Sequence, residues 1–293
     1  ALVHSRAVPF SGSPMKLPPF LLAAPAFLLL AACAGAPAPA EREAKANEIA
    51  GANGFATATL QTARFDLLSR VRGAASIGLL TVYIEGDGLA WERRDRRSSD
   101  PTPVNPIAMK LAAADPASAV AYLARPCQYT GGDAARNCRS DLWTTERYGE
   151  ESVSAMNEAL DKLKENAGAS RLALVGYSGG GTIAALLAAR RTDVSWIKSV
   201  ASPLDTDAFT TFHKVTPLSG SLNPANSAAR LKDLPQIHYV GQKDDVVPAA
   251  INRRFLARMG ETSCAELVTI AGMDHARWDE VWRSLASEKP DCH

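Results

Sequence analysis

The chain has little of several features that define other classes of protein. Its 293 residues include only five cysteines, and 32 basic against 31 acidic side chains leave a formal net charge of +1. No basic block favours a nucleic-acid partner, and no internal repeat is present. The sequence contains no Cys-x-x-Cys pair, the pattern that would indicate a zinc site. The longest apolar run is shorter than the roughly 20 residues that span a bilayer. We therefore expect no nucleic acid, no metal and no transmembrane helix.

That apolar run has the form of an export signal. Lys16, a short apolar core from Leu17 to Ala32 and small residues at its end are typical of a secretory signal peptide. The run ends in Leu30-Ala31-Ala32-Cys33, which resembles the lipobox of bacterial lipoproteins. In a lipobox the chain is cut just before the cysteine, and that cysteine carries the lipid. The alternative is an ordinary secretory signal that happens to end near a cysteine.

These features divide the chain into three parts. Residues 1–32 hold a segment upstream of the first methionine and the signal peptide. Residues 33–56 hold the lipidated Cys33 and a tether rich in Ala and Pro, and residues 57–293 form the folded domain. Removing residues 1–32 takes away Arg6 and Lys16 and no acidic residue, so 261 residues with a formal charge of −1 remain. We expect a protein anchored by lipid to the bacterial cell envelope and facing the periplasm, with Ala34 favouring the outer membrane.

Four cysteines follow Cys33, and four cysteines allow three pairings. Disulfides persist in the oxidising compartment that export implies. We expect the local pairing: Cys127 with Cys138 pins a loop, and Cys264 with Cys292 fastens the C-terminal tail to a late strand. Zinc is the alternative, but no nearby histidine supports it.

From about Thr57 onward, short apolar runs alternate with amphipathic helical patterns. Leu79–Ile84 is almost entirely apolar, which predicts a strand buried on both faces, and Glu150–Ala167 has the period of a helix. Further strands are expected at 63–71, 119–124, 171–176, 196–201, 236–240 and 265–270, and further helices at 179–191, 249–258 and 277–287. The alternation implies a mostly parallel sheet with helices on both faces. Residues 209–231 break it and predict a long loop or small lid over the sheet's carboxyl edge, where α/β folds bind ligands.

A serine lies between a predicted buried strand and a predicted helix, in Gly176-Tyr177-Ser178-Gly179-Gly180. In this Gly-x-Ser-x-Gly setting the serine sits at a sharp, strained turn that lifts its hydroxyl above the sheet. The N-terminus of the following helix points at the reacting centre and favours developing negative charge. We therefore expect Ser178 to be a nucleophile. The alternative is a glycine-rich helix cap without chemistry.

A serine hydroxyl is a weak nucleophile unless a base takes its proton. Of the five histidines, His275 lies in a loop between a strand and the final helix and is the expected base, with His213 as the alternative. His238 alternates with apolar neighbours inside a strand, so we expect it to pack in the core. The base needs a carboxylate to orient it. Asp244, after the strand at 236–240, is the expected partner, with Asp245 as the alternative.

Three motifs in this order resemble the α/β-hydrolase superfamily. They are the serine pentapeptide, the turn Gly-x-x-Asp ending at Asp244 before an apolar pair and a proline, and the loop ending at His275. The resemblance covers about residues 63–285 and implies the α/β-hydrolase fold, with acyl hydrolysis through a covalent acyl-enzyme and without metal or organic cofactor. Within the superfamily, the stretches YIEGDG, LARPCQY and SLNP are similar to a group of bacterial lipoprotein hydrolases.

The resemblance also implies two oxyanion donors. One is the backbone N–H of Gly179, and the other belongs to Asp87 or Gly88 in a Glu-Gly-Asp-Gly loop after an early strand. Acidic side chains beside an oxyanion oppose its charge unless they point away or are paired. We expect arginines that follow closely to pair with them, namely Arg93, Arg94, Arg96 and Arg97. The alternative is that the loop is only a turn.

An esterase acting on a small-molecule acyl substrate is the leading functional expectation, because the predicted lid is short and not strongly apolar. A peptidase or amidase with the same triad is the first alternative. A non-catalytic envelope binding protein on the same fold is the second, and it predicts loss of a triad member, whereas all three positions are filled. An anchored assembly partner predicts a large exposed apolar surface or repeats, and the sequence indicates neither.

Overall fold

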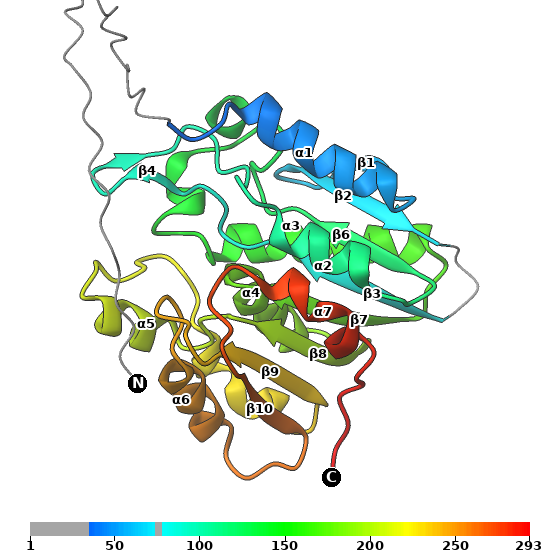
Figure 1. Cartoon of the computed structure of the whole chain (residues 1–293), viewed down its shortest axis with the longest axis vertical. Helices are drawn as coiled ribbons and strands as arrows, with labels where there is room; N and C mark the ends of the chain where they lie inside the picture. Colours follow the sequence, from blue (N-terminus) through cyan, green and yellow to red (C-terminus); the bar gives the residue numbers. More distant parts are fainter. Residues whose placement is uncertain (1–34, 74–77) are drawn as a thin grey trace, which may run out of the picture. The chain divides into compact units, whose positions relative to one another are not determined.

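One mixed sheet of eight strands organises the computed structural model, which describes residues 35–73 and 78–293 (Figure 1). The strands are β1 (Ala56–Gln61), β2 (Asp66–Arg72), β3 (Leu79–Ile84), β6 (Val120–Leu123), β7 (Arg171–Tyr177), β8 (Val194–Val200), β9 (Gln236–Gly241) and β10 (Ala265–Ile270). Their order in the sheet is β1-β2-β6-β3-β7-β8-β9-β10. Strands β6, β3, β7, β8, β9 and β10 run parallel, whereas β2 is antiparallel to both β1 and β6.

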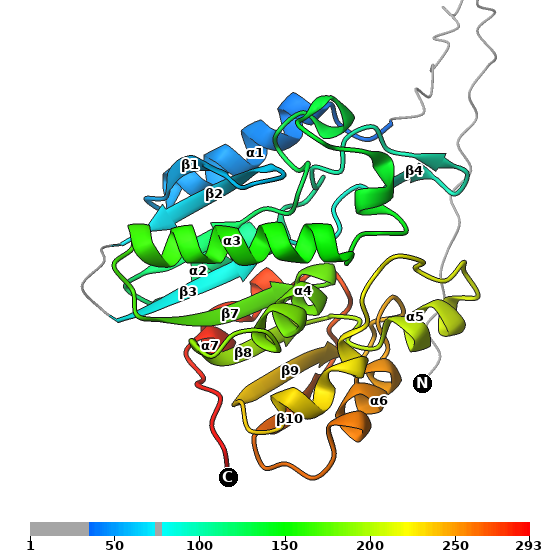
Figure 2. The ribbon, with the colours of Figure 1, turned by 180° about the vertical axis from the view of Figure 1, so that it is seen from behind.

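Helices cover both faces of this sheet (Figures 1 and 2). The helices are α1 (Pro39–Ala52), α2 (Ile107–Ala114), α3 (Glu150–Asn166), α4 (Gly179–Ala188), α5 (Thr206–His213), α6 (Ala249–Met259) and α7 (Trp282–Ala286). One apolar core joins the sheet to α3, α4 and α6, and a second joins it to α1, α2 and α7. The predicted α/β architecture, with a mostly parallel sheet between two helical layers, is confirmed.

Near-continuous apolar sequence marks the buried strands well, because a parallel sheet is covered on both faces. The strands predicted at 79–84 and 265–270 are β3 and β10, with the expected bounds. The predicted bounds of some other elements differ from those in the structure. The strand predicted at 63–71 is β2 and begins at Asp66, and the last predicted helix is divided into a short turn at Trp278–Glu280 and α7.

The segment predicted to be a tether contains a helix instead. In α1, Ala46 and Ala50 are buried in the core shared with α2 and α7. Arg42, also buried, donates a hydrogen bond to the carbonyl of Thr102. Gly35–His293 form one unit with its own core. The alanines that resemble a linker in the sequence therefore supply a small apolar helix face, and the folded domain begins well before residue 57.

Several short elements carry no clear signal in the sequence. Strand β1 exposes five of its six residues, so it lacks the alternation that marks a half-buried strand. Helix α2 spans only eight residues and is buried over most of its length. Both were missed because their periodicity is too short or too weak to register.

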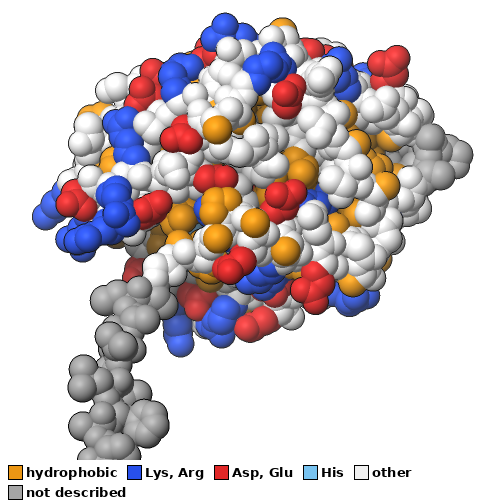
Figure 3. Space-filling model, turned by 90° about the horizontal axis from the view of Figure 1, so that it is seen from above, with side chains coloured by type: hydrophobic (Ala, Val, Ile, Leu, Met, Phe, Trp, Pro, Cys, Tyr) orange, Lys and Arg blue, Asp and Glu red, His pale blue; other side chains and the backbone are white. Residues whose placement is uncertain are grey.

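A separate two-stranded sheet, β4 (Trp91–Arg93) and β5 (Arg96–Arg97), lies outside the main sheet. All five of its residues are exposed. In the space-filling view of Figure 3, basic and acidic side chains are interspersed over much of the visible face, and basic ones gather at the edge where Figure 1 places β4.

Two disulfides join Cys127 to Cys138 and Cys264 to Cys292, which is the pairing that we expected. The first holds the loop after β6, and the second holds the C-terminal tail against the start of β10. In the part of the chain that the structure describes, no helix has the length and apolar character needed to cross a membrane. Cys33 and the predicted signal peptide lie outside the described residues.

The packing of α1 gives a test of where the domain begins. Ala46 has no exposed surface, whereas Ala44 on the same helix is exposed. Because an unpaired buried charge is costly, Ala46→Asp should lower the free energy of unfolding by about 3 kcal/mol, and Ala44→Asp by no more than about 0.5 kcal/mol. Urea unfolding of both variants measures this. Equal effects at the two positions would show that α1 does not pack on the domain.

Candidate active site

A strained turn carries the predicted nucleophile. Strand β7 ends at Tyr177 and α4 begins at Gly179, so Ser178 alone joins them. Its backbone angles, φ 49° and ψ −125°, are costly for a residue with a side chain. A Cβ atom at Gly176 would lie 2.3 Å from the backbone of Gly180, so only glycine lets the strand and helix approach this closely. The turn holds the Ser178 hydroxyl at the carboxyl end of β7.

The structure brings Ser178, His275 and Asp244 into one hydrogen-bonded chain. His275 Nε2 lies 3.2 Å from Ser178 Oγ, and His275 Nδ1 lies 2.9 Å from Asp244 Oδ2. The Asp244 carboxylate is fully buried, and its Oδ1 accepts hydrogen bonds from the amides of Val246 (2.9 Å) and Val247 (2.8 Å). Asp244 is therefore fixed by the backbone and can orient the imidazole so that Nε2 accepts from the serine hydroxyl.

Parallel strands explain why residues so far apart in the sequence meet. Asp244 follows β9 and His275 follows β10, and the carboxyl ends of parallel strands lie at one edge of a sheet. Asp245, the alternative acid, is exposed and makes no hydrogen bond to His275. The structure thus places Asp244, not its neighbour, against the imidazole.

His213 and His238 both lie away from Ser178. His213, the alternative base, is at the end of α5, where its Nε2 lies 2.7 Å from the carbonyl of Val246. His238 is fully buried on β9, and its Nδ1 lies 2.8 Å from Ser199 Oγ on β8. Burial lowers the pKa of His238 to about 3. This second serine–histidine pair is enclosed in the core, as we predicted for His238, and no substrate can reach it.

Tyr177, the variable residue before the serine, supports the histidine. Its hydroxyl donates a hydrogen bond of 2.9 Å to the backbone carbonyl of His275. The two rings also pack with their centroids 5.5 Å apart. Tyr177 therefore links the elbow of β7 to the loop that carries the base. No pattern in the sequence indicates this contact, because the motif does not specify the residue before the serine.

The predicted oxyanion loop lies directly over the serine. A Cβ atom on Gly86 would be 3.4 Å from Ser178 Cβ. Within the loop, the amide of Gly86 donates to Glu85 Oε1, and that of Leu89 donates to the carbonyl of Pro101. The amides of Gly179, Asp87 and Gly88 enter none of the hydrogen bonds found among the described residues. These three amides are therefore the ones left available for an oxyanion.

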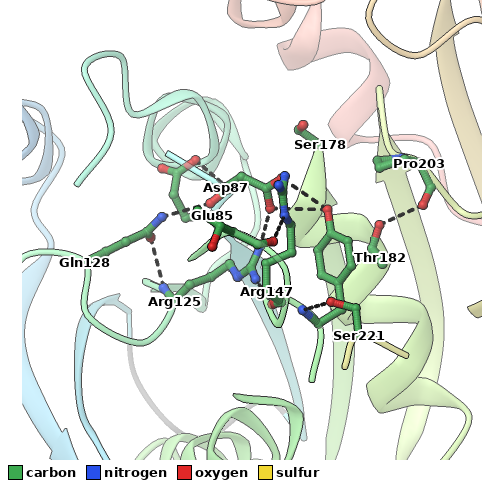
Figure 4. A network of polar contacts seen from close by, with 12 residues as sticks. Glu85, Asp87, Arg125, Gln128, Arg147, Ser178, Thr182, Pro203 and Ser221 are labelled. Atoms are coloured by element: carbon green, nitrogen blue, oxygen red, sulfur yellow. Dashed lines mark hydrogen bonds and ion pairs between the residues drawn. The ribbon is translucent and has the colours of Figure 1, made fainter. Parts of the chain in front are cut away.

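The Asp87 carboxylate lies against Gly179, where a Cβ atom would be 2.0 Å from its Oδ1, and it is held in a network of cations (Figure 4). Its carboxylate accepts hydrogen bonds from Arg125 Nη1 (2.6 Å), Arg147 Nη1 (2.7 Å) and the Tyr148 hydroxyl (3.2 Å). Burial opposes ionisation, but the guanidiniums of Arg147 and Arg125 outweigh it and hold the pKa of Asp87 below its ordinary value. The two arginines give this cluster a net positive charge. An anionic side chain next to the serine thus does not oppose an oxyanion.

The expected partners of this acid were wrong. The four arginines between positions 93 and 97 lie on the exposed β4–β5 hairpin, and three of them pair with other acids; Arg97, for example, lies 2.6 Å from Asp141. Nearness in sequence misled the prediction, because the chain turns outward after the loop. Arg125 and Arg147 come from two later loops, and no spacing rule marks them.

Glu85, the other acid of the loop, faces the opposite side of the sheet. Its Oε1 accepts hydrogen bonds from the amides of Gly86 (2.9 Å) and Ala108 (3.3 Å), and its Oε2 accepts one from Tyr122 (3.1 Å). Ala108 lies in the first turn of α2, so the Glu85 carboxylate accepts a hydrogen bond from one of the free amides at the N-terminus of that helix. Burial raises the pKa of Glu85 to about 7, although these hydrogen bonds favour its charged form.

A pocket of about 300 Å³ opens beside the proposed triad. It is lined by Glu85, Gly86, Asp87, Gly88, Leu89, Pro103, Val104, Asn105, Tyr177, Ser178 and His275. Ligand pockets range from about 300 to 1,000 Å³, so this one is at the small end. None of its lining residues comes from the segment 209–231, which forms the end of α5 and short turns at the same edge of the sheet.

The described residues contain no evident metal site. Across 35–73 and 78–293, no group of three or more His, Cys, Asp or Glu side chains is arranged to hold a metal ion. The four cysteines of the domain are all in disulfides. Of the three hydrogen-bonded residues, Ser178 and His275 line the pocket.

Comparison with known proteins places the fold. No protein-family model matches the chain, and no curated protein sequence matches it either. Solved structures do. An esterase of Pyrococcus furiosus is similar with a TM-score of 0.56 and 15% identity, over 80% of this chain and 89% of that one. An α/β serine hydrolase without lid from Xanthomonas campestris is similar with a TM-score of 0.52 and 14% identity, over 80% and 90%.

A membrane phospholipase A, a bacterial virulence factor, is similar with a TM-score of 0.54 and 15% identity, over 85% of this chain and 89% of that one. At such low identities the similarity concerns the fold. The described residues therefore have the α/β-hydrolase fold, as the order of the three motifs predicted.

The pKa of Glu85 leads to a pH-dependent stability. Because its pKa rises from 4.5 to about 7 on folding, the folded protein keeps a proton that the unfolded chain has released. Stability should fall by roughly 3 kcal/mol as the pH rises from about 4.5 to 7, and this fall should be absent from Glu85→Gln. Urea unfolding at several pH values tests it, with the exposed Glu165→Gln as a control that keeps the wild-type slope. A Glu85→Gln slope equal to wild type would contradict the assignment.

Proposed function

We propose that this protein is a serine esterase that cleaves small acyl esters through a covalent acyl-enzyme. The observation that carries the proposal is the hydrogen-bonded chain from Asp244 through His275 to Ser178, which opens on a pocket. Three residues from separate loops meet in the geometry that activates a serine hydroxyl. A binding protein does not need three residues hydrogen-bonded in this way. The presence of Ser178, His275 and Asp244 together therefore disfavours the non-catalytic alternative.

In the proposed first half-reaction, Ser178 Oγ attacks the acyl carbon while His275 Nε2 takes the hydroxyl proton. Asp244 stabilises the imidazolium that forms. The amide of Gly179, with that of Asp87 or Gly88, donates to the oxyanion. The ester C–O bond then breaks, and the alcohol leaves with the proton held by His275. The acyl group remains on Ser178.

The second half-reaction repeats the same steps with water. His275 takes a proton from water as its oxygen attacks the acyl carbon, and the same amides hold the second oxyanion. Collapse returns the proton to Ser178 Oγ and releases a carboxylic acid. The arginine pair on Asp87 supports both oxyanions, because it neutralises the carboxylate that lies against the site. No metal or organic cofactor takes part in this scheme.

The proposed cellular setting rests on the predicted signal peptide with Cys33 and on the two disulfides. We place the protein in the bacterial cell envelope, attached to a membrane through lipid on Cys33, and we regard it as one of the bacterial lipoprotein hydrolases. The two disulfides support an oxidising compartment. Small-molecule esters are the expected substrates, and amides cleaved by the same triad are the alternative.

The two serine–histidine pairs allow a matched test of the nucleophile. Ser178→Ala should lower turnover of a nitrophenyl ester by at least about 10⁴-fold and abolish labelling by a fluorophosphonate probe. Ser199→Ala removes the hydroxyl of the buried pair and should keep both activities. Circular dichroism checks that each variant is folded. If Ser178→Ala retains labelling and turnover while Ser199→Ala loses them, the proposed site is wrong.

The pocket volume predicts the chain-length preference. Leu89 and Val104 are the branched apolar side chains in its lining, and about 300 Å³ accommodates only a short acyl group. Nitrophenyl esters with about two to four acyl carbons should give the highest kcat/KM, because the nitrophenyl group has to share this small volume with the acyl chain. Leu89→Ala should shift the optimum toward longer chains. A wild-type optimum on long acyl chains would contradict the idea that this pocket holds the acyl group.

A further inference from the structure

The β4–β5 hairpin has no evident role in holding the fold together. Its strands, Trp91–Arg93 and Arg96–Arg97, pair only with each other, and every residue from 91 to 97 is exposed. One end continues from the oxyanion loop through Leu89, a residue of the pocket. The hairpin is thus a projection from the rim of the proposed active site.

Its charge is mostly positive and only partly neutralised. The seven residues contain four arginines and two acids. Arg96 pairs with Glu92 at 2.8 Å, whereas Arg93 lies 3.9 Å from Asp95 and remains 71% exposed. Arg94 enters none of the ion pairs among the described residues. The hairpin therefore exposes two guanidiniums, those of Arg93 and Arg94, that lack a close acidic partner among the described residues.

An aromatic side chain accompanies these cations. Trp91 is 40% exposed, and the guanidinium of Arg97 lies over its ring at 5.8 Å from the centroid. An exposed tryptophan beside arginines is the combination found where proteins meet the headgroups of a bilayer, because indole favours the interface and guanidinium pairs with phosphate. Nothing in the folded domain explains why Trp91 is left exposed.

Other exposed apolar side chains lie at the same edge of the molecule. Phe212 is 54% exposed and Val215 52% exposed, at and just after the end of α5, and Val246 is 38% exposed in the loop after Asp244. Figures 1 and 2 both place α5 and β4 at the edge where the parallel strands end. The rim of the site thus combines basic and apolar surface.

The chain also enters the folded unit at this edge. Helix α1 begins at Pro39, on the side of the folded unit where Figures 1 and 2 place β4, and Arg42 in its first turn donates a hydrogen bond of 3.2 Å to the carbonyl of Asp100. Gly35, the first described residue, follows Cys33 by two positions. A lipid on Cys33 would therefore hold this edge, rather than the opposite one, toward a membrane.

We propose that the β4–β5 hairpin docks the active-site rim onto a bilayer that contains anionic phospholipid. Arg93 and Arg94 meet lipid phosphates, and Trp91 inserts at the headgroup level. The pocket then faces the membrane surface, so the esters it receives are those present at that surface. The docking goes beyond the esterase proposal and does not depend on it, because binding to a vesicle requires no turnover.

A pair of matched double variants tests the docking. The chain from Ala34, which keeps the whole folded unit, is sedimented with vesicles of phosphatidylcholine alone or mixed with an equal part of phosphatidylglycerol. Arg93→Gln/Arg94→Gln should weaken binding to the mixed vesicles about 30-fold, since each arginine near an anionic surface is worth about a factor of five. Lys162→Gln/Arg171→Gln removes two cations at the opposite edge of the sheet and should bind like wild type.

Activity on a soluble nitrophenyl ester, unchanged in both double variants, shows that the fold and the site are intact. Trp91→Ala should weaken binding to both kinds of vesicle. Three results would overturn the proposal: a wild type that ignores the anionic vesicles, a hairpin variant that binds them like wild type, or binding through the hairpin to duplex DNA in place of vesicles. A catalytically dead protein that still binds vesicles would leave the docking standing and remove the esterase proposal.

Discussion

Ser178 is held at φ 49° between β7 and α4, and this strained turn is the constraint that the rest of the site serves. Its amide donates to the carbonyl of Val200 on the neighbouring strand at 2.8 Å, so the sheet itself holds the turn. Glycine at position 176 lets the helix start against the strand. The order of parallel strands then decides which loops can reach the serine. Those after β9 and β10 do, and they carry Asp244 and His275.

The charge around the active site depends on how two acids near Ser178 are arranged. The loop over Ser178 carries two acids, and the structure deals with them differently. Asp87 is ionised and surrounded by Arg125 and Arg147, so the local charge is positive. Glu85 is buried beneath α2 and can take up a proton near neutral pH. Both arrangements keep uncompensated negative charge away from the amides of Gly179, Asp87 and Gly88, where the proposed mechanism needs an oxyanion.

Much of this could be predicted from the sequence, and the reasons for the rest are physical. Buried strands and the elbow motif are local patterns, so β3, β10 and the position of Ser178 were predictable. The pairing of Asp244 with His275 was predictable because both residues follow predicted parallel strands, and the carboxyl ends of parallel strands lie at one edge of a sheet. Arg125 and Arg147 were not, because long-range partners of a buried acid leave no periodic trace. Helix α1 was mistaken for a tether because a small apolar face made of alanine has the composition of a linker.

The central claim is that Ser178 carries the acyl group during turnover. The direct measurement is to mix the enzyme with a nitrophenyl ester of a short acid, quench with acid within the turnover time, and map the peptides by mass spectrometry. The account predicts an added acyl mass on the peptide that contains Ser178, present at early times and absent once substrate is exhausted. Ester hydrolysis with no such adduct, or with the acyl group on another residue, would contradict it.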